Sequence, residues 1–285
     1  MEGTSRKVER LEEQEESDGL AGSALMADKR GLVLGVANDH SIAWGIARML
    51  HKHGAALAFT YQGEAFGKRV KPLAESLGCE TVMSCDADRE DDLDRVFEQL
   101  GRDWGRLDFV VHAIAHSDKE ELKGRYVDTT RSNFARTLSV SCYSFTAIAQ
   151  RAAPLMTEGG SLLTLSYLGA QRVTPSYNVM GVAKAALEAS VRYLATDLGP
   201  QDVRVNAISA GPMRTLAGSA VSDARFVYGW SRDNAPLRRS VDLDEVGGAA
   251  LYLLSDLSRG VTGEIMNVDC GYNVVGIPSP DRKGD

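Results

Sequence analysis

From Lys29 onward, short apolar runs alternate with amphipathic segments along the chain. Several runs are continuously apolar, which is typical of strands that are covered on both faces of a sheet. The runs predict strands over residues 31–37, 56–62, 80–86, 107–115, 160–167, 203–209 and 264–270. Apolar residues at helical spacing between them predict helices over residues 41–53, 64–77, 90–104, 130–156, 177–198 and 244–255.

Strands and helices thus alternate strictly, with short connections. Glycines stand where helices should end, at Gly54, Gly78, Gly105 and Gly199. This order predicts right-handed crossovers and an α/β fold, a single Rossmann-type doubly wound parallel sheet of about seven strands with helices on both faces. No internal repeat or second core is visible, so we expect residues 26–285 to form one domain.

Residues 1–25 differ from this pattern. Between Glu2 and Asp18 there are seven acidic and three basic residues and no aromatic residue. The segment lacks the apolar core of a signal peptide, and its acids disfavour a mitochondrial presequence. We therefore predict a disordered acidic N-terminal extension. Met26, just before the first predicted strand, is an alternative start of the chain.

Composition and charge exclude several classes of protein. With 44% hydrophobic and 25% charged residues, the chain can form a sizeable core, unlike a fibre, a disulfide scaffold or a disordered protein. Its 39 acidic and 32 basic residues give a net charge of −7, which disfavours nucleic-acid binding. No apolar run approaches the roughly 18 residues that cross a membrane. The four cysteines form no CxxC pair, which favours free thiols in a cytoplasmic protein and no metal site.

The turn after the first predicted strand is a candidate dinucleotide site. Gly35 would allow a tight exit from the strand, and Gly45 would let the following helix pack close to the sheet. The N-terminus of that helix would face a pyrophosphate. The spacing differs from GxGxxG, so an ordinary strand–helix turn with Ser41 as N-cap is an open alternative.

The end of the second predicted strand bears on cofactor choice. Gln62 stands where an adenosine ribose is recognised and can hydrogen-bond a ribose hydroxyl. A 2′-phosphate would require an adjacent arginine, whereas Lys68 and Arg69 lie more than a helical turn further on. NADH is therefore favoured over NADPH.

A tyrosine and a lysine define the candidate chemistry. Tyr177 and Lys184 are seven residues apart, about two helical turns, and so share one face of a helix. A lysine on a sheet-facing surface needs a partner for its ammonium, which a cofactor ribose would supply. A chance Tyr and Lys on a helix is the alternative.

The chain resembles the enoyl-acyl-carrier-protein reductases of bacterial fatty-acid synthesis, which are divergent short-chain dehydrogenase/reductases. The resemblance covers about residues 27–278 and is carried by Tyr-x6-Lys, by Tyr167, by SIAWG at 41–45 and by GPMRT at 211–215. It implies hydride transfer from NADH to the β-carbon of a trans-2-enoyl thioester. Tyr177 would stabilise the enolate, Lys184 would hold the nicotinamide ribose, and Tyr167 would line the acyl pocket.

The spacing of Tyr177 and Lys184 suits this chemistry. Carbonyl-reducing relatives use Tyr-x3-Lys, but residue 181 is a glycine here. In enoyl thioester reduction the charge develops on the thioester oxygen, several bonds from the carbon that receives hydride, so the tyrosine must stand farther from the nicotinamide. A 3-ketoacyl or other carbonyl reductase is the nearest alternative. A non-catalytic dinucleotide sensor is a third, disfavoured because Tyr177, Lys184 and Tyr167 are all present.

By resemblance, further residues receive cofactor or substrate roles. Cofactor contacts fall on Gly35, Ser41, Ile42, Gln62, Asp86, Ala87, Ile114, Lys184, Met213, Arg214, Thr215, Leu216 and Ala217. Ser117, Tyr167 and Tyr177 would contact the substrate. Asp86 could meet the adenine amino group, with helix N-capping as the alternative, and Ile114 could equally be a core residue.

Three positions depart from the family pattern. Ala115 replaces a glycine and His116 an aromatic residue, both beside the acyl pocket. We expect His116 at the solvent edge, since no carboxylate partner is evident. Cys270 replaces a glycine in an Asp-Gly-Gly segment, and we expect a small packed thiol near a subunit contact.

The long connection at about residues 214–236 is expected to form a lid over the substrate. Five arginines against two aspartates between Arg214 and Arg239 could dock an acidic acyl carrier protein, or could be solvated or paired between subunits. The resemblance also implies a homotetramer, with the helices at 130–156 and 177–198 at one interface.

Overall fold

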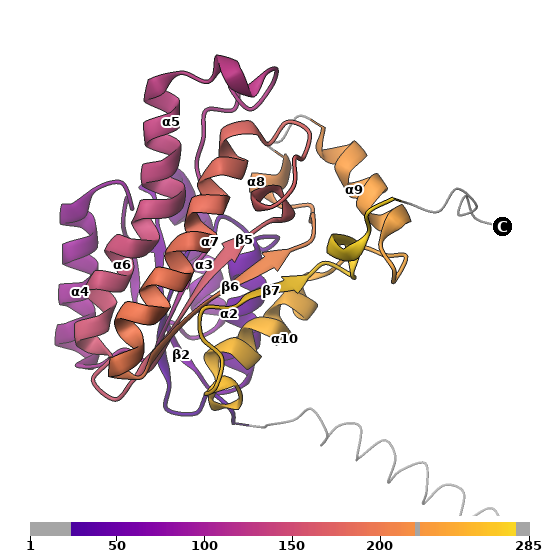
Figure 1. Ribbon diagram of the computed structural model, residues 1–285. Coiled ribbons are helices and arrows are strands. Elements are labelled where there is room, and N and C mark those ends of the chain that lie inside the picture. Colours follow the sequence, from indigo (N-terminus) through magenta and orange to yellow (C-terminus); the bar gives the residue numbers. More distant parts are fainter. Residues whose placement is uncertain (1–23, 220–222, 278–285) are drawn as a thin grey trace, which may run out of the picture.

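The computed structural model describes residues 24–219 and 223–277 and contains one parallel sheet of seven strands, in the order β3-β2-β1-β4-β5-β6-β7 (Figure 1). The strands are β1 (Arg30–Leu34), β2 (Ala56–Tyr61), β3 (Val82–Ser84), β4 (Phe109–His112), β5 (Gly160–Ser166), β6 (Val203–Ala210) and β7 (Ile265–Val268). All seven predicted strands are present. Six of them end earlier than predicted, because the residues that follow leave the ladder and form loops at the carboxyl edge of the sheet.

The helices agree with prediction except in two regions. The main helices are α2 (Ile42–Lys52), α3 (Gly63–Ser76), α4 (Glu90–Trp104), α7 (Asn178–Leu198) and α10 (Leu243–Leu254). The helix predicted over 130–156 consists instead of α5 (Arg131–Leu138), a π-helical turn (Ser139–Tyr143), α6 (Ser144–Ala152) and a 3-10 turn (Ala153–Leu155). Further 3-10 turns are Tyr126–Asp128, Leu168–Ala170, Gly199–Gln201, Asp256–Ser258 and Tyr272–Val274.

The predicted lid contains helices that its composition did not indicate. These are α8 (Leu216–Ser219) and α9 (Ala224–Asn234), which Figure 1 shows beside the carboxyl ends of β5 and β6. Alanine, serine and glycine dominate the first half of this segment, so no apolar periodicity marks it. Only Ser231 of α9 is buried, so this helix contributes little to the core.

Two apolar clusters cover the faces of the sheet, which confirms the doubly wound arrangement. On one face, α2 and α10 contribute buried residues such as Ile46 and Leu253. On the other, α4, α6 and α7 contribute Leu100, Phe145 and Leu187. Each of these side chains is fully buried, and such burial typically contributes about 1.5–3 kcal/mol per residue.

Gly45 allows close packing, but against α10 and not against the sheet as predicted. A Cβ at Gly45 would lie 2.8 Å from the Cβ of Leu243, and one at Gly247 would lie 3.0 Å from the Cβ of Met49. Glycines thus bring the two helices together, and Arg48 pairs with Asp244 at 2.6 Å across the same contact.

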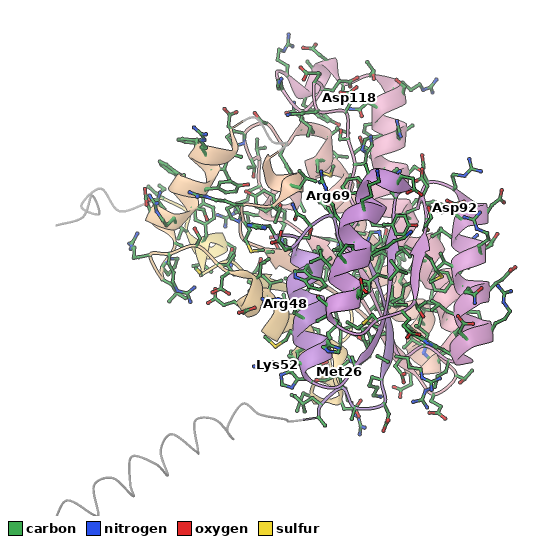
Figure 2. The ribbon with its side chains drawn as sticks, turned by 180° about the vertical axis from the view of Figure 1, so that it is seen from behind. Met26, Arg48, Lys52, Arg69, Asp92 and Asp118 are labelled. Carbon is green, nitrogen blue, oxygen red and sulfur yellow. The ribbon has the colours of Figure 1, made fainter. Side chains whose placement is uncertain are left out.

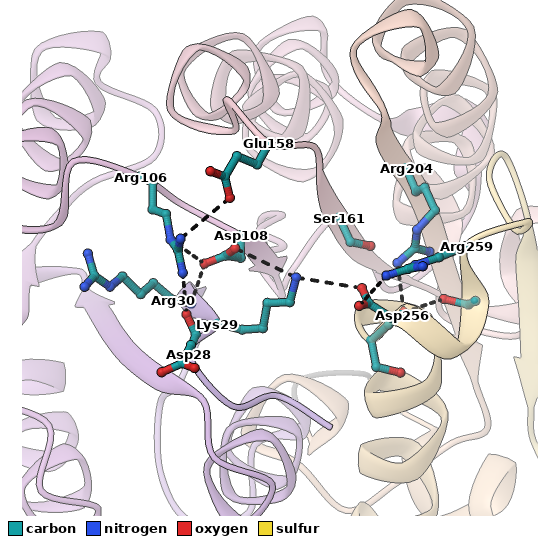
Figure 3. A network of polar contacts seen from close by, with 12 residues as sticks. Asp28, Lys29, Arg30, Arg106, Asp108, Glu158, Ser161, Arg204, Asp256 and Arg259 are labelled. Carbon is teal, nitrogen blue, oxygen red and sulfur yellow. Dashed lines mark hydrogen bonds and ion pairs between the residues drawn. The ribbon is translucent and has the colours of Figure 1, made fainter. Parts of the chain in front are cut away.

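Charged residues join the amino-terminal ends of the strands (Figure 3). The carboxylate of Asp108, just before β4, accepts a hydrogen bond from the backbone N–H of Arg30 at 2.8 Å. Lys29 lies 4.0 Å from Asp108 and 3.7 Å from Asp256, and Arg106 lies 3.6 Å from Asp108. We call this set the amino-end network.

Most of the predicted acidic extension, residues 1–23, lies outside the described residues. Met26 is described: its side chain is fully buried in the core, and its N–H donates to His53 O at 3.0 Å. Within the described ranges there is no helix long and apolar enough to cross a membrane and no cluster of metal-ligating side chains.

Candidate active site

A cavity of about 580 Å³ lies at the carboxyl ends of the strands, where loops after β1 to β6 converge with the lid helices. In doubly wound sheets this edge is the usual ligand site, because the chain order reverses there, here between β1 and β4. Predicted site residues that line it are Gly35, Ser41, Ile42, Gln62, Asp86, Ala87, Ile114, Ser117, Tyr167, Tyr177, Lys184, Met213, Thr215 and Leu216. Arg214 is exposed and is not among the lining residues, and the side chain of Ala217 lies outside the described part.

The turn between β1 and α2 has the geometry of an anion site. Gly35 has φ +100°, and a Cβ there would lie 2.1 Å from Ala113 O, so the turn excludes any side chain. Ser41 is the N-cap residue of α2 but makes no capping hydrogen bond. Its Oγ instead accepts from the N–H groups of Ala37 and Asn38 at 3.0 and 3.1 Å. The first turn of α2 contains no acidic residue, which leaves its N–H groups able to bind a phosphate.

The part of the cavity predicted to hold adenosine is bordered by Gln62 and Asp86. The Asp86 carboxylate accepts from Asp88 N–H at 3.0 Å, while the N-cap of α4 is Arg89, so the alternative role of Asp86 as N-cap is wrong. Arg69 on α3, labelled in Figure 2, is exposed and, like Lys68, is not among the lining residues.

Tyr177 and Tyr167 lie side by side in the lining of the cavity. Their rings pack edge to face with centroids 5.0 Å apart. Tyr177 is the N-cap of α7 and not its first residue, and it lies between Ser176 (φ 55°) and Asn178 (φ 38°). Non-glycine residues adopt such angles only where the surroundings hold them. Asn178 is held, because its Nδ2 donates to Leu122 O at 3.1 Å.

Both phenols are neutral at physiological pH. Burial raises the pKa of Tyr177 far above its usual range, with smaller contributions from Tyr167 and Glu188. Burial also raises the pKa of Tyr167 to about 12, partly offset by a hydrogen bond with Thr174. Each tyrosine therefore retains a proton that it can donate to a ligand oxygen.

Lys184 is buried beneath the tyrosines. Its Nζ donates to Leu165 O at 2.8 Å, and an ammonium has two further N–H donors for a ligand. Burial lowers the pKa of Lys184 to about 8, and Cys142 and Glu188 act in the opposite direction.

A glycine contact explains the absence of a lysine at position 181. A Cβ at Gly181 would lie 2.8 Å from Gly169 O, and one at Gly169 would lie 2.4 Å from the Tyr177 ring. The loop after β5 therefore packs directly on α7, and a side chain at 181 would displace it. The Tyr-x3-Lys arrangement of carbonyl reductases cannot form here without moving this loop.

Sequence reasoning missed one polar residue of the cavity, Tyr228, and two buried polar residues outside its lining, His112 and Glu188. His112, at the end of β4, lies 2.8 Å from Thr164 Oγ1 and 2.9 Å from Ser144 Oγ. Burial, together with the charge of Lys184, lowers its pKa to about 3. Glu188 is also buried, and Tyr228 on α9 lines the cavity with a buried hydroxyl that has no hydrogen-bond partner among the described residues. A histidine within an apolar strand and an acid four residues after Lys184 were signals for the first two.

Other predicted positions lie as follows. Ser117 Oγ accepts from Thr137 Oγ1 at 3.0 Å. Ala115 and His116 are exposed at the rim of the cavity, which confirms the solvent-edge position of His116. Cys270 is buried with φ 57°, a conformation that favours glycine, and burial raises the pKa of its thiol.

The arginines near the lid are only partly unpaired. Arg232 pairs with Asp233 at 2.7 Å, and Arg239 pairs with Glu245. Arg225 on α9 is exposed and forms no ion pair with any described residue. The local positive charge is thus smaller than the sequence count indicates. It rests on Arg225 together with Arg214 and Arg238, which are exposed and also form no ion pair with a described residue.

Comparison with known proteins gave consistent matches. A family model described as "Enoyl-(Acyl carrier protein) reductase" matches residues 35–273. The "Enoyl-[acyl-carrier-protein] reductase [NADH] 2" of Rhizobium meliloti (strain 1021) is 63% identical over 257 residues, which are 90% of this chain and 96% of that protein.

Two solved structures extend this similarity. The reductase of Anaplasma phagocytophilum in complex with NAD is 62% identical, with a TM-score of 0.87 over 90% of this chain and 97% of the other. The Bacillus cereus enzyme, solved with NADP+ and indole naphthyridinone, is 49% identical, with a TM-score of 0.87 over 89% and 99%.

Proposed function

Because the chain belongs to the enoyl-acyl-carrier-protein reductase family and is an NADH-dependent enoyl reductase, we propose that Tyr177, Lys184 and Tyr167 carry out its chemistry. The substrate is a trans-2-enoyl thioester. When bound, NADH supplies the hydride that reaches the β-carbon. The α-carbon of the enolate then takes a proton from water, so that the double bond becomes a single bond.

The residues around the cavity suit this cofactor. A side chain at Gly35 would fill the space beside Ala113, and the uncapped first turn of α2 suits a pyrophosphate. Gln62 would bind the adenosine ribose, with Asp86 and Ile114 beside the adenine. Lys184 would hold the nicotinamide ribose with its remaining N–H donors. Residues 213–217 would hold the nicotinamide amide, with the inclusion of Arg214 weakened by its exposed position.

Tyr177 is proposed to stabilise the enolate. Its neutral phenol would donate a hydrogen bond to the thioester oxygen, where negative charge collects as hydride arrives. A donor that is already oriented in a buried site stabilises such charge better than water does, because no reorientation is needed. Tyr167 packs on the same ring and would position the acyl chain beside Ser117.

The observation that carries this assignment is the Gly169–Gly181 contact, which supports a tyrosine two turns from its lysine and opposes the carbonyl-reductase arrangement. Loss of NADH absorbance with a crotonyl thioester tests it, with an acetoacetyl thioester and NADPH as comparisons. We expect turnover with crotonyl substrate and NADH. Faster reduction of the acetoacetyl substrate would contradict the proposal.

The partner is proposed to be an acyl carrier protein that docks at Arg225. Carrier proteins are acidic, and Arg225 is an exposed cation of the lid that forms no ion pair with a described residue. Arg225→Glu should raise KM for carrier-linked substrate and leave KM for a short thioester unchanged. Arg232→Glu, at a residue already paired with Asp233, is the matched control and should have a smaller effect. Equal effects of Arg225→Glu on both substrates would reject docking there.

We also propose that the protein is a cytoplasmic homotetramer, as the family resemblance implies. Tyr143, next to α6, and Tyr193, on α7, are 52% and 77% exposed, and large exposed aromatic side chains favour an interface. Light scattering coupled to size exclusion tests the assembly. A monomer for the wild type, or a tetramer that survives Tyr193→Glu and Tyr143→Glu together, would contradict this interface.

A further inference from the structure

A buried carboxylate that the proposed chemistry does not use lies one helical turn after Lys184. Glu188 is 5% exposed. Its Oε1 accepts from Ser166 Oγ at 2.6 Å, and its Oε2 accepts from Gln171 Nε2 at 3.2 Å. Both oxygens thus act as acceptors, as in an ionised carboxylate. Neither partner is charged, so these hydrogen bonds leave its negative charge uncompensated.

The end of β5 connects this carboxylate to the site. Three consecutive residues there make three contacts with α7 and its N-cap. Leu165 O accepts from Lys184, Ser166 Oγ donates to Glu188, and the Tyr167 ring packs on Tyr177. A disturbance at Glu188 would therefore act on the position of β5 and on both tyrosines.

The charge of Glu188 also acts on Lys184, but the side chains of Glu188 and Lys184 form no ion pair. Burial lowers the pKa of Lys184, and Cys142 and Glu188 act to raise it. They are four residues apart on α7, so their side chains are neighbours on one face of the helix. Both are buried, and a buried charge is stabilised chiefly by an opposite charge nearby.

Other titratable groups act on Lys184 or lie in the same cavity. His112 on β4 and Cys142 in the π-helical turn interact with it through charge, and Tyr177 at the N-cap of α7 lines the same cavity. Among these groups and Glu188, Glu188 is the only carboxylate.

We propose that Glu188 is a positioning residue for the reaction, whose buried negative charge keeps the ammonium of Lys184 charged and whose hydrogen bonds hold the end of β5 that carries Tyr167. This rests on the proposed role of Lys184 in binding the nicotinamide ribose. The carboxylate itself touches neither substrate nor cofactor in this scheme and acts through Lys184 and Ser166.

The test is the pH dependence of kcat for the purified enzyme with NADH and a crotonyl thioester. Wild-type kcat should fall as pH rises through about 8, where Lys184 loses its proton. Glu188→Gln keeps the size of the side chain and an acceptor for Ser166 but removes the charge. We expect the alkaline fall of kcat to move down by about one to two pH units, the size typical of a close charge pair. At pH 7 kcat should drop several-fold, and it should recover at lower pH.

Control variants distinguish the effect of the Glu188 charge from a general effect on the structure. Asp197→Asn removes an exposed charge from the same helix and should leave the profile unchanged. An unshifted profile in Glu188→Gln, with or without a lower kcat, would overturn the proposal. Where Glu188→Gln does not fold, Glu188→Asp keeps the charge but withdraws it by one methylene. It should shift the profile in the same direction by a smaller amount, and no shift would again overturn the proposal.

A lysine variant distinguishes this inference from the proposed function. Lys184→Arg carries a guanidinium that stays protonated, so the alkaline fall should disappear. If the fall persists in Lys184→Arg, the proposed role of Lys184 is wrong, and Glu188 loses its role with it. If the fall disappears in Lys184→Arg but is unshifted in Glu188→Gln, only the inference about Glu188 is wrong.

Discussion

The two ends of the sheet hold their polar groups in opposite ways. At the amino end, the Asp108 carboxylate accepts from the Arg30 backbone N–H and lies near Lys29 and Arg106 (Figure 3). The side chains of Lys29 and Arg106 are 34% and 37% exposed. At the carboxyl end, Lys184 is buried with one recorded hydrogen bond. In Figure 2, Met26 and Asp118 lie toward these two opposite ends of the molecule.

The comparison of the two ends indicates that stability and catalysis depend on different groups of residues. Charges that are paired and partly solvated cost little to fold, and much of their charge is already met by a partner within the protein. Buried donors with few partners cost more, and their remaining N–H and O–H groups are available to a substrate. Changes at the carboxyl end should therefore lower activity more than stability, and changes at the amino end should do the reverse.

The largest expected effect is at Tyr177. Tyr177→Phe removes the proposed donor to the enolate, so kcat should fall by about a hundred- to a thousandfold. The free energy of unfolding should change little, because the ring and its contact with Tyr167 remain. NADH oxidation and urea unfolding measure the two effects. Near-normal turnover would refute the role of Tyr177.

The pH dependence of stability should reveal how much free energy it costs to bury the Lys184 cation. Its pKa is lowered to about 8 in the folded state, so above that pH the unfolded chain binds more protons than the folded one. The loss of stability caused by burying the cation is fully present below pH 8 and disappears as pH approaches the usual lysine pKa. Lys184→Met should therefore be more stable than wild type at pH 7 by about 2–3 kcal/mol, with the advantage shrinking at higher pH. Urea unfolding of both proteins across this pH range measures it. A stability difference that does not change with pH would contradict it.

A methyl group at position 181 should shift the loop that carries Tyr167 without removing any side chain of the site. The added Cβ meets Gly169 O at 2.8 Å, so the loop that carries Tyr167 must shift. We expect Gly181→Ala to lower kcat by about tenfold, which corresponds to about 1.4 kcal/mol in the activation free energy. Gly229→Ala, where a Cβ would meet nothing within 4 Å, is the matched control. Unchanged activity in Gly181→Ala would show that the contact does not set the site.

The smallest effect is expected at the amino-end network. Asp108→Asn keeps an oxygen for the Arg30 N–H but removes the ion pairs with Lys29 and Arg106. Pairs with this degree of exposure contribute up to about 1 kcal/mol, so the unfolding midpoint should fall slightly and kcat should not change. A loss of activity at a temperature where the variant stays folded would contradict the separation of the two ends.

The local sequence pattern was sufficient to predict most of the strands and helices and to indicate the family. All seven strands were predicted from apolar runs, and α4 begins and ends at the predicted residues. These predictions succeed because the spacing of apolar residues within one segment indicates which of its faces is buried, without reference to the rest of the chain. Likewise, the Tyr-x6-Lys spacing indicated a shared helical face, and the resemblance it carries indicated the family.

Tertiary structure decided the rest. The bond from Ser166 to Glu188, the contact of Gly169 with Gly181 and the pairing of Lys29 with Asp256 join residues far apart in sequence. Whether such groups meet depends on strand register and on how closely a loop approaches a helix, and neither property is encoded in the periodicity of one segment. The α9 helix was missed although Phe226 and Trp230, four residues apart, share one of its faces and stack on each other; only Ser231 of this helix is buried.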